Sequence, residues 1–237
     1  MFDKLKADFI QSFITDDRWL LYVKGLGVTL RLAVVALAIG IVIGVIVAVI
    51  RSAHDSRRVN QKKNIFLEIA DKICRLYLTV IRGTPMMVQL LIMYFVIFAS
   101  SRKPILVATL AFGINSGAYV AEIVRSGIMS VDRGQMEAGR SLGLSYRQTM
   151  TKIIIPQAIR NILPALGNEM ITLLKDTSLV NVVGVRDLTK TAINIQGVTY
   201  QAFMPFVGIA IIYLILVMIL TKLLGMLERR LRQSDRS

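Results

Sequence analysis

The chain has 237 residues, of which 54% are apolar and only 7% aromatic; this apolar share exceeds the roughly 45–50% that is usual for a soluble domain. The excess is aliphatic and gathers in long blocks, which argues against a water-soluble globule. The formal net charge is +14, but the basic residues lie between the apolar blocks without any nucleic-acid motif, which argues against a nucleic-acid-binding protein.

Residues 1–20 are predicted to form an amphipathic segment that lies on the outer surface of the membrane. A cleavable signal peptide would need a basic region followed by an uninterrupted apolar core. Four aspartates break that pattern: Asp3, Asp8, Asp16 and Asp17. We therefore expect this segment to lead into the first membrane span.

Five apolar blocks follow within residues 21–230, and each is long enough for the roughly 20 residues that a helix needs to cross a bilayer core. They are Lys24–Ile50, Ile69–Ala99, Pro104–Met129, Lys152–Leu174 and Phe203–Leu227. We therefore expect residues 21–230 to form one transmembrane domain. The predicted fold class is an all-α integral membrane protein with about five transmembrane helices.

The charges between the blocks predict the orientation. An odd number of spans puts the termini on opposite sides, and loops rich in Lys and Arg stay in the cytoplasm. The basic residues of the first loop and of the C-terminal end are Arg51, Arg57, Arg58, Lys62 and Lys63, then Arg229, Arg230, Arg232 and Arg236. We expect a multi-pass protein of the plasma or inner membrane, with the N-terminus outside and the tail at 231–237 in the cytoplasm.

Two of the blocks contain helix breakers. The second contains Arg82-Gly83-Thr84-Pro85, and the fourth contains Pro156, Pro164 and Gly167. In hydrocarbon a broken helix is tolerated only where it packs in protein or lines a cavity. Each break therefore marks either a cavity wall or a purely structural kink.

Several classes of chemistry have no motif in the sequence. No GxxxxGK[ST] phosphate loop occurs, so the chain is expected neither to bind ATP in that way nor to be an enzyme. His54 is the single histidine, and neither a metal cluster nor a catalytic constellation is evident. We expect no cofactor on this chain. The single cysteine, Cys74, excludes an intrachain disulfide and is expected to be a small buried hydrophobe.

The segment between the third and fourth blocks, about residues 134–156, contains the most specific motif. It has Glu137-Ala138-Gly139, then Gly143 after three residues, then Ile153-Ile154-Ile155-Pro156 after nine. This resembles the EAA signature of ABC importer permeases, although Gly139 replaces the second alanine and Ile155 a leucine. The resemblance implies a cytoplasmic coupling helix that docks into an ATPase subunit. The residues assigned to coupling are Glu137, Ala138, Gly139, Ser141, Leu142, Gly143 and Tyr146.

Four further stretches resemble the polar amino acid branch of these permeases, which includes histidine, arginine and glutamine permease subunits. They lie at residues 81–90, 115–123, 156–164 and 174–179. The resemblance implies the type I ABC importer permease fold. It also implies a second permease copy or a homologous permease, two ATPase subunits that bind ATP and Mg²⁺, and an external solute-binding protein that delivers an amino acid.

Ionisable groups within a bilayer are costly, so they are the first candidates for a substrate site. Glu169, Thr172 and Asp176 share one helical face through their spacing. Other polar candidates from the second and third blocks are Thr84, Gln89, Asn115 and Ser116. An ionised Glu169 would favour arginine, lysine or histidine as substrate. Alternatively, Glu169 pairs with Lys175 or Arg82, or is protonated.

Two further pairs of polar residues are expected to have structural roles. Glu122 and Arg125 are expected to pair with each other, and Gln157 and Arg160 to hold the coupling region in place. The same type of importer for glutamine, glutamate or cystine is an alternative, and an ion-coupled secondary amino acid transporter or a membrane-embedded enzyme is a more remote one. Uptake that depends on internal ATP and is indifferent to ionophores distinguishes the importer.

Overall fold

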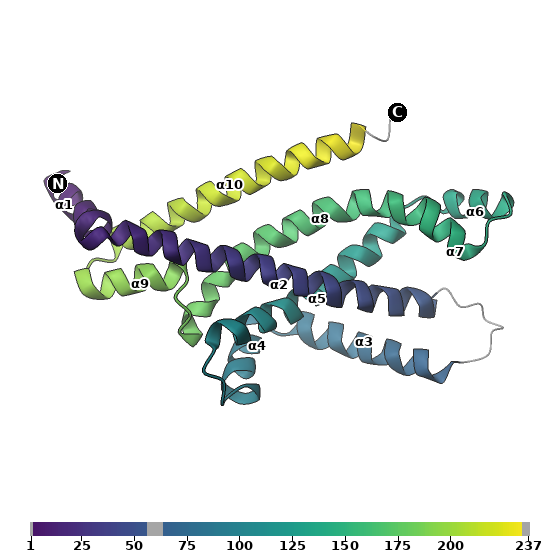
Figure 1. Ribbon diagram of the computed structural model, residues 1–237, viewed down its shortest axis with the longest axis horizontal. Coiled ribbons are helices and arrows are strands. Elements are labelled where there is room, and N and C mark those ends of the chain that lie inside the picture. Colours follow the sequence, from purple (N-terminus) through teal and green to yellow (C-terminus); the bar gives the residue numbers. More distant parts are fainter. Residues whose placement is uncertain (1, 56–63, 234–237) are drawn as a thin grey trace. The chain divides into compact units, whose positions relative to one another are not determined.

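The computed structural model describes residues 2–55 and 64–233, and the side chains up to residue 231 (Figure 1). Within those residues all regular structure is helical. The α-helices of this part are α1 Phe2–Phe9, α2 Arg18–Asp55, α3 Ile65–Gly83, α4 Met86–Ile92, α5 Pro104–Met129, α6 Arg133–Ser141, α7 Tyr146–Thr149, α8 Ile155–Asp176, α9 Leu188–Thr199 and α10 Phe203–Gln233. The predicted loop cations Arg57, Arg58, Lys62 and Lys63, and Arg236 of the tail, lie outside the described residues.

The number of spans depends on how two elements are counted, namely the interrupted pair of α3 and Met86–Ile97, and the polar helix α8. Among the described residues, three helical segments are long and apolar enough to cross a membrane, namely Phe2–Asp55, Pro104–Met129 and Phe203–Leu231, and α3 with Met86–Ile97 gives a fourth if the two are counted as one broken span. The remaining predicted span, the fourth block, is α8, whose 22 residues extend over about 33 Å at 1.5 Å per residue. It is less apolar than those segments, because polar and charged residues such as Arg160, Asn168 and Glu169 occur along it.

The second predicted span is interrupted where its Gly-Thr-Pro sequence predicted a break. Helix α3 ends at Gly83, and Thr84 has extended dihedrals of φ −123° and ψ 146°. The residue before a proline avoids the helical region because of the proline ring. Helix α4 therefore starts anew at Met86 and continues into a π-turn at Met93–Ile97.

The described chain forms two compact units. The first comprises the residues up to Ala36, Met86–Phe112 and Met170–Leu223. The second comprises Leu37–Pro85, Gly113–Glu169 and the residues from Leu224 onward.

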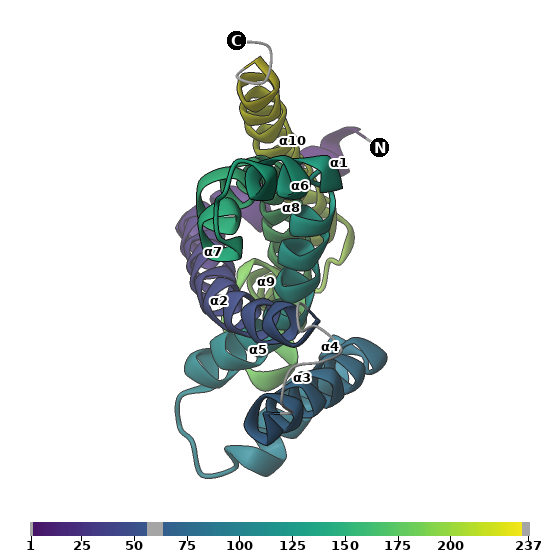
Figure 2. The same ribbon diagram turned by 90° about the vertical axis from the view of Figure 1, so that its right-hand side faces the viewer.

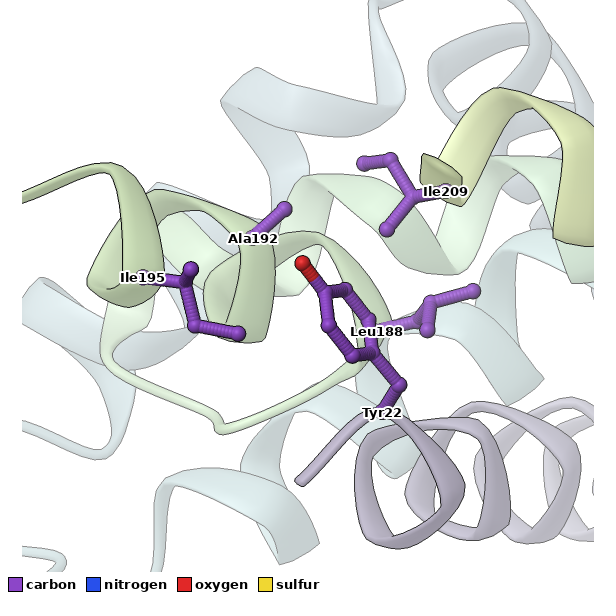
Figure 3. Packing of buried hydrophobic residues seen from close by; sticks show 5 residues of the cluster. All are labelled: Tyr22, Leu188, Ala192, Ile195 and Ile209. Atoms are coloured by element: carbon purple, nitrogen blue, oxygen red, sulfur yellow. The ribbon is translucent and has the colours of Figure 1, made fainter. Parts of the chain in front are cut away.

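The first unit is organised around an apolar cluster, shown in Figure 3. It joins Tyr22 of α2, Ile209 of α10, and Leu188, Ala192 and Ile195 of α9, all buried. The N-terminal segment extends this packing, because the ring of Phe13 stacks on Tyr22 with centroids 5.0 Å apart.

Hydropathy did not predict helix α9. Its N-cap is Asp187, whose carboxylate accepts hydrogen bonds from the backbone N–H groups of Thr189 and Lys190 at 3.1 and 2.8 Å. The Asp187 side chain is fully buried, and this burial raises the pKa of the carboxyl group above its ordinary value.

In the second unit, α3 lies beside the C-terminal half of α2 (Figure 1). Val47 of α2, Cys74 and Leu78 of α3, and Ala118 and Ala121 of α5 form its buried cluster. Cys74 is thus the small buried hydrophobe that the sequence predicted.

An ionic cluster also joins α2 to α3. The carboxylate of Asp71 is buried and lies 2.6 Å from Arg75, 3.7 Å from Arg51 and 3.8 Å from His54.

Candidate functional site

The second unit contains a cavity of about 520 Å³ between α3, α5 and α8, called here the α3–α5–α8 cavity. This volume lies within the range of about 300–1,000 Å³ that is usual for small-molecule sites. Its lining residues are Arg82 of α3, then Tyr119, Glu122, Ile123, Ser126, Gly127 and Ser130 of α5 and its C-terminal end, and Asn161, Ala165 and Glu169 of α8.

Charged groups of both signs line this cavity. The guanidinium of Arg82 lies 3.6 Å from the Glu122 carboxylate, and its Cζ lies 5.9 Å from the centroid of the Tyr119 ring. Glu122 is also 4.0 Å from Arg125, so the predicted pair with Arg125 is present, but it is shared with Arg82. A planar guanidinium stacked on an aromatic ring is well placed to bind a carboxylate.

Glu169 is the second carboxylate of the cavity. Its Oε1 accepts a hydrogen bond of 2.8 Å from Ser116 Oγ, and Ser116 is fully buried. Asn161 of α8 donates to Ser130 Oγ at 2.8 Å. The cavity therefore offers acceptors for an ammonium group and a donor for a carboxylate, as an amino acid zwitterion requires.

The predicted substrate residues have different positions. Of the seven, only Glu169 lines the cavity. Ser116 donates a hydrogen bond to Glu169, and the buried Asn115 precedes Ser116 in the sequence. Thr84 Oγ1 donates to the Val80 carbonyl at the end of α3. The remaining three, Gln89, Thr172 and Asp176, belong to the first unit.

Sequence reasoning missed most of the cavity wall, although a signal was present. The lining residues of α5 and its end fall at 119, 122, 123, 126, 127 and 130, and those of α8 at 161, 165 and 169. Both sets follow the spacing of three and four residues that defines one helical face. A helical-wheel reading of the third block would have found this stripe.

The coupling segment is built from a short helix, a glycine turn and a second helix start. Helix α6 begins at the N-cap Asp132, whose side chain accepts from Gly134 N at 2.7 Å. Gly143 has a φ of +84°, which an L side chain adopts only with strain. The bonds from Leu144 N to Gly139 O and from Gly143 N to Arg140 O complete a Schellman motif.

The second helix start is specified equally well. Ser145 is the N-cap of α7 and forms a capping box with Gln148, so two orphan backbone donors are satisfied reciprocally. The chain continues through a π-turn at Met150–Ile154 into α8. Figure 2 shows α6 and α7 as neighbours, and the two are in contact.

The packing around position 139 explains why glycine replaces the second alanine of the EAA signature. A Cβ atom at Gly139 would lie 2.6 Å from Cγ2 and 3.0 Å from Oγ1 of the buried Thr149. Only glycine permits this close approach of α6 to the following helix.

The other coupling residues are largely exposed. Glu137, Ala138, Ser141 and Tyr146 are exposed, and Leu142 is 80% exposed. Behind this surface, Gln157 of α8 donates to Gln135 of α6 at 3.4 Å, which supports the structural role expected for Gln157.

Residues 64–233 match the family described as the binding-protein-dependent transport system inner membrane component. The chain belongs to this family. It is a multi-pass inner membrane protein and the permease subunit of an amino acid ABC importer, a complex that includes ATPase and substrate-binding partners.

Individual relatives agree with this assignment. The chain is 36% identical to the arginine transport system permease protein ArtQ of Bacillus subtilis, over 90% of this chain and 93% of ArtQ. It is 40% identical to the glutamine transport system permease protein GlnP of Escherichia coli, over 69% and 77% of the two chains. A solved structure described as an amino acid ABC transporter with histidines matches with a TM-score of 0.80 and 42% identity, over 89% of this chain and 94% of that one. The fold is therefore that of a type I importer permease.

Proposed function

We propose that this permease imports amino acids with a cationic side chain, such as arginine, lysine or histidine, through the α3–α5–α8 cavity. The observation that carries the proposal is the charge of the wall. Among the described residues, two carboxylates line the cavity, Glu122 and Glu169, against the single guanidinium of Arg82. A cationic amino acid bears one net positive charge and complements this wall. The relative named for arginine and the solved transporter with histidines support the same substrate class.

Each group has a distinct role in this proposal. Arg82, held over Tyr119, binds the substrate α-carboxylate, while Glu122 and Glu169 accept from its ammonium and side-chain cations. Ser116 positions the Glu169 carboxylate through its hydrogen bond. Thr84, Gln89, Asn115, Thr172 and Asp176 remain predicted contacts along the pathway.

The test is the substitution Glu169→Gln in the complete complex, reconstituted with its binding protein. A hydrogen bond to a charged group contributes about 1.5–3 kcal/mol, so uptake of arginine relative to glutamine should fall about 10-fold to 100-fold. Glu68→Gln is the matched control, because Glu68 of α3 pairs with Lys72 at 3.5 Å and does not line the cavity. An unchanged ratio in the Glu169 variant would remove this residue as a selector.

An importer of glutamine, glutamate or cystine is the second candidate. The 40% identity to a relative named for glutamine favours glutamine within this group. In that case glutamine would be taken up faster than arginine by the unmodified complex, and Glu169→Gln would leave that preference intact.

We also propose how ATP hydrolysis drives this permease. The exposed face of α6, with Leu142 at its end, docks into an ATPase subunit, and two permeases alternate between outward-open and inward-open states as the ATPases close and separate. The permease performs no chemistry on the substrate and binds no cofactor; it acts by different affinities in two conformations. The orientation is N-terminus outside and C-terminus in the cytoplasm, which places α6 beside the ATPase.

This part is tested by a cross-link. A cysteine introduced by Ser141→Cys in a Cys74→Ala background should cross-link to the ATPase and react with reagents only from the cytoplasmic side. Labelling from outside would overturn the orientation. Uptake that collapses with an ionophore while internal ATP is kept constant would instead favour an ion-coupled transporter.

A further inference from the structure

A second cavity lies on the inner side of the coupling segment, within the second unit. Its volume is about 730 Å³. Its walls come from the ends of three helices of the membrane domain and from the segment α6 to α8. The lining residues are Ala48, Val49, Ser52, Ala53, Leu67, Val124 and Ile128 from α2, α3 and α5, and Arg140, Tyr146, Arg147, Met150, Thr151 and Ile155 from the coupling segment and the start of α8. It is called here the basic cavity.

The charge of the basic cavity is one-sided. Arg140 and Arg147 line it, and no aspartate or glutamate is found among its described lining residues. Neither arginine forms an ion pair within residues 2–55 and 64–233. Two guanidinium groups facing one hollow without a carboxylate are complementary to an anion.

The opposite wall is mostly apolar and is formed by residues of the helices α2, α3 and α5. Val49 of α2 and Val124 of α5 lie in helices of spanning length, and Val49 is 60% exposed. A small soluble anion gains no favourable contact with such an apolar wall, whereas an acyl chain packs against it. The cavity thus combines an apolar side on helices of spanning length with a basic side on the coupling segment.

We propose that the basic cavity binds an anionic phospholipid of the leaflet that faces the coupling segment. Arg140 and Arg147 bind the phosphate of the headgroup, and the acyl chain lies against Val49, Val124 and Ile128. Basic pockets between membrane helices are known to select anionic headgroups. The lipid would fill the space between the coupling segment and the membrane helices, so the coupling surface would be supported by lipid as well as by protein.

The test uses the whole importer complex with its ATPase, purified in detergent and mixed with phosphatidylglycerol or phosphatidylcholine, and retained lipid is counted by native mass spectrometry. We expect retention of phosphatidylglycerol in preference to phosphatidylcholine. The double variant Arg140→Gln/Arg147→Gln should weaken phosphatidylglycerol binding about 30-fold, since each basic residue contributes about fivefold. The matched control Arg229→Gln/Arg230→Gln removes the same charge from α10, outside the cavity, and should retain the lipid.

A second variant separates the lipid from a role of the arginines in docking. Val49→Trp fills the apolar side and leaves both arginines and the coupling segment in place, and it too should lose the lipid. Three results would overturn the proposal: equal retention of both lipids, equal loss in the arginine pair and in the α10 control, or full retention in both cavity variants. Loss of the ATPase from the arginine variant with lipid still bound would assign the cavity to a protein partner instead.

Discussion

The substitution Gly139→Ala gives the sharpest test of the coupling geometry, because it restores the alanine of the family signature. From the motif alone this change should be harmless or beneficial. The structure predicts the opposite, since the new Cβ would lie 2.6 Å from Thr149 Cγ2 and 3.2 Å from Ile153 Cδ1. Thr149 cannot yield easily, because it is buried and its hydroxyl donates to the Ser145 carbonyl at 3.1 Å. Its β-branched side chain is also stiff at χ1.

The expected magnitude follows from two opposing effects. Adding a methyl group to a well-packed site costs about 1–3 kcal/mol, while alanine is about 1 kcal/mol more favourable than glycine within a helix. The net cost of seating α6 against α7 is therefore about 1 kcal/mol on average. That corresponds to about a fivefold smaller ratio of seated to unseated coupling segment.

The assay is ATP hydrolysis by the reconstituted complex, stimulated by the loaded binding protein. Gly139→Ala should lower the stimulated rate by up to about fivefold, the limit set by the smaller ratio of seated to unseated segment, and leave the amount of assembled permease unchanged. The double variant Gly139→Ala/Thr149→Ala removes both contacting Thr149 atoms and should recover most of the rate. Full stimulation in the single variant would refute the packing argument, and failure of the double variant to recover would show that Thr149 is not the obstacle.

Three further outcomes follow from the site and the fold. Arg82→Gln should raise the half-saturation concentration for arginine and glutamine alike, by about 10-fold or more, because it removes the carboxylate anchor that all amino acids share. Leu142→Glu should abolish ATPase assembly without unfolding the permease, because this side chain is 80% exposed. Asp187→Ala should lower the free energy of unfolding by about 1–2 kcal/mol through loss of the N-cap. The substitution should also flatten the pH dependence of the free energy of unfolding. Burial raises the pKa of Asp187, so the folded chain binds this proton more tightly than the unfolded chain does. In the unmodified chain, stability therefore falls as the pH rises from the ordinary pKa of the carboxyl group to the raised one.

Each of these three substitutions is measured against a control. Arg75→Gln removes an α3 arginine that does not line the α3–α5–α8 cavity and should leave both half-saturation values unchanged. For Leu142→Glu, copurification with the ATPase is measured against Leu142→Ala, which should retain it. Thermal unfolding of Asp187→Ala across the acidic range is compared with the unmodified chain, and parallel curves would contradict the titration of this group.

The coupling segment was predictable because its structure is local. The left-handed turn at Gly143 and the capping box of Ser145 and Gln148 are specified by residues a few positions apart, so their spacing in the sequence determines the geometry. The requirement for glycine at 139 was not predictable, because it depends on Thr149 in the next helix. Hydropathy failed in the same way for α9, whose 12 residues are too few and too polar to stand out, although Leu188 and Ile195 are fixed by burial against Tyr22.

The α3–α5–α8 cavity shows where single-residue reasoning stops. Glu169 was found because a carboxylate within an apolar helix is costly on its own. Ser126, Ser130 and Asn161 carry no such cost individually, and they become a wall only because α5 and α8 present them on facing stripes. Arg82 was visible as a charge at a helix break and as a possible partner of Glu169, whereas Glu122 was assigned to a structural pair. The structure places both on one cavity with Glu169, so the chemistry of this site depends on the packing of three helices and not on any one motif.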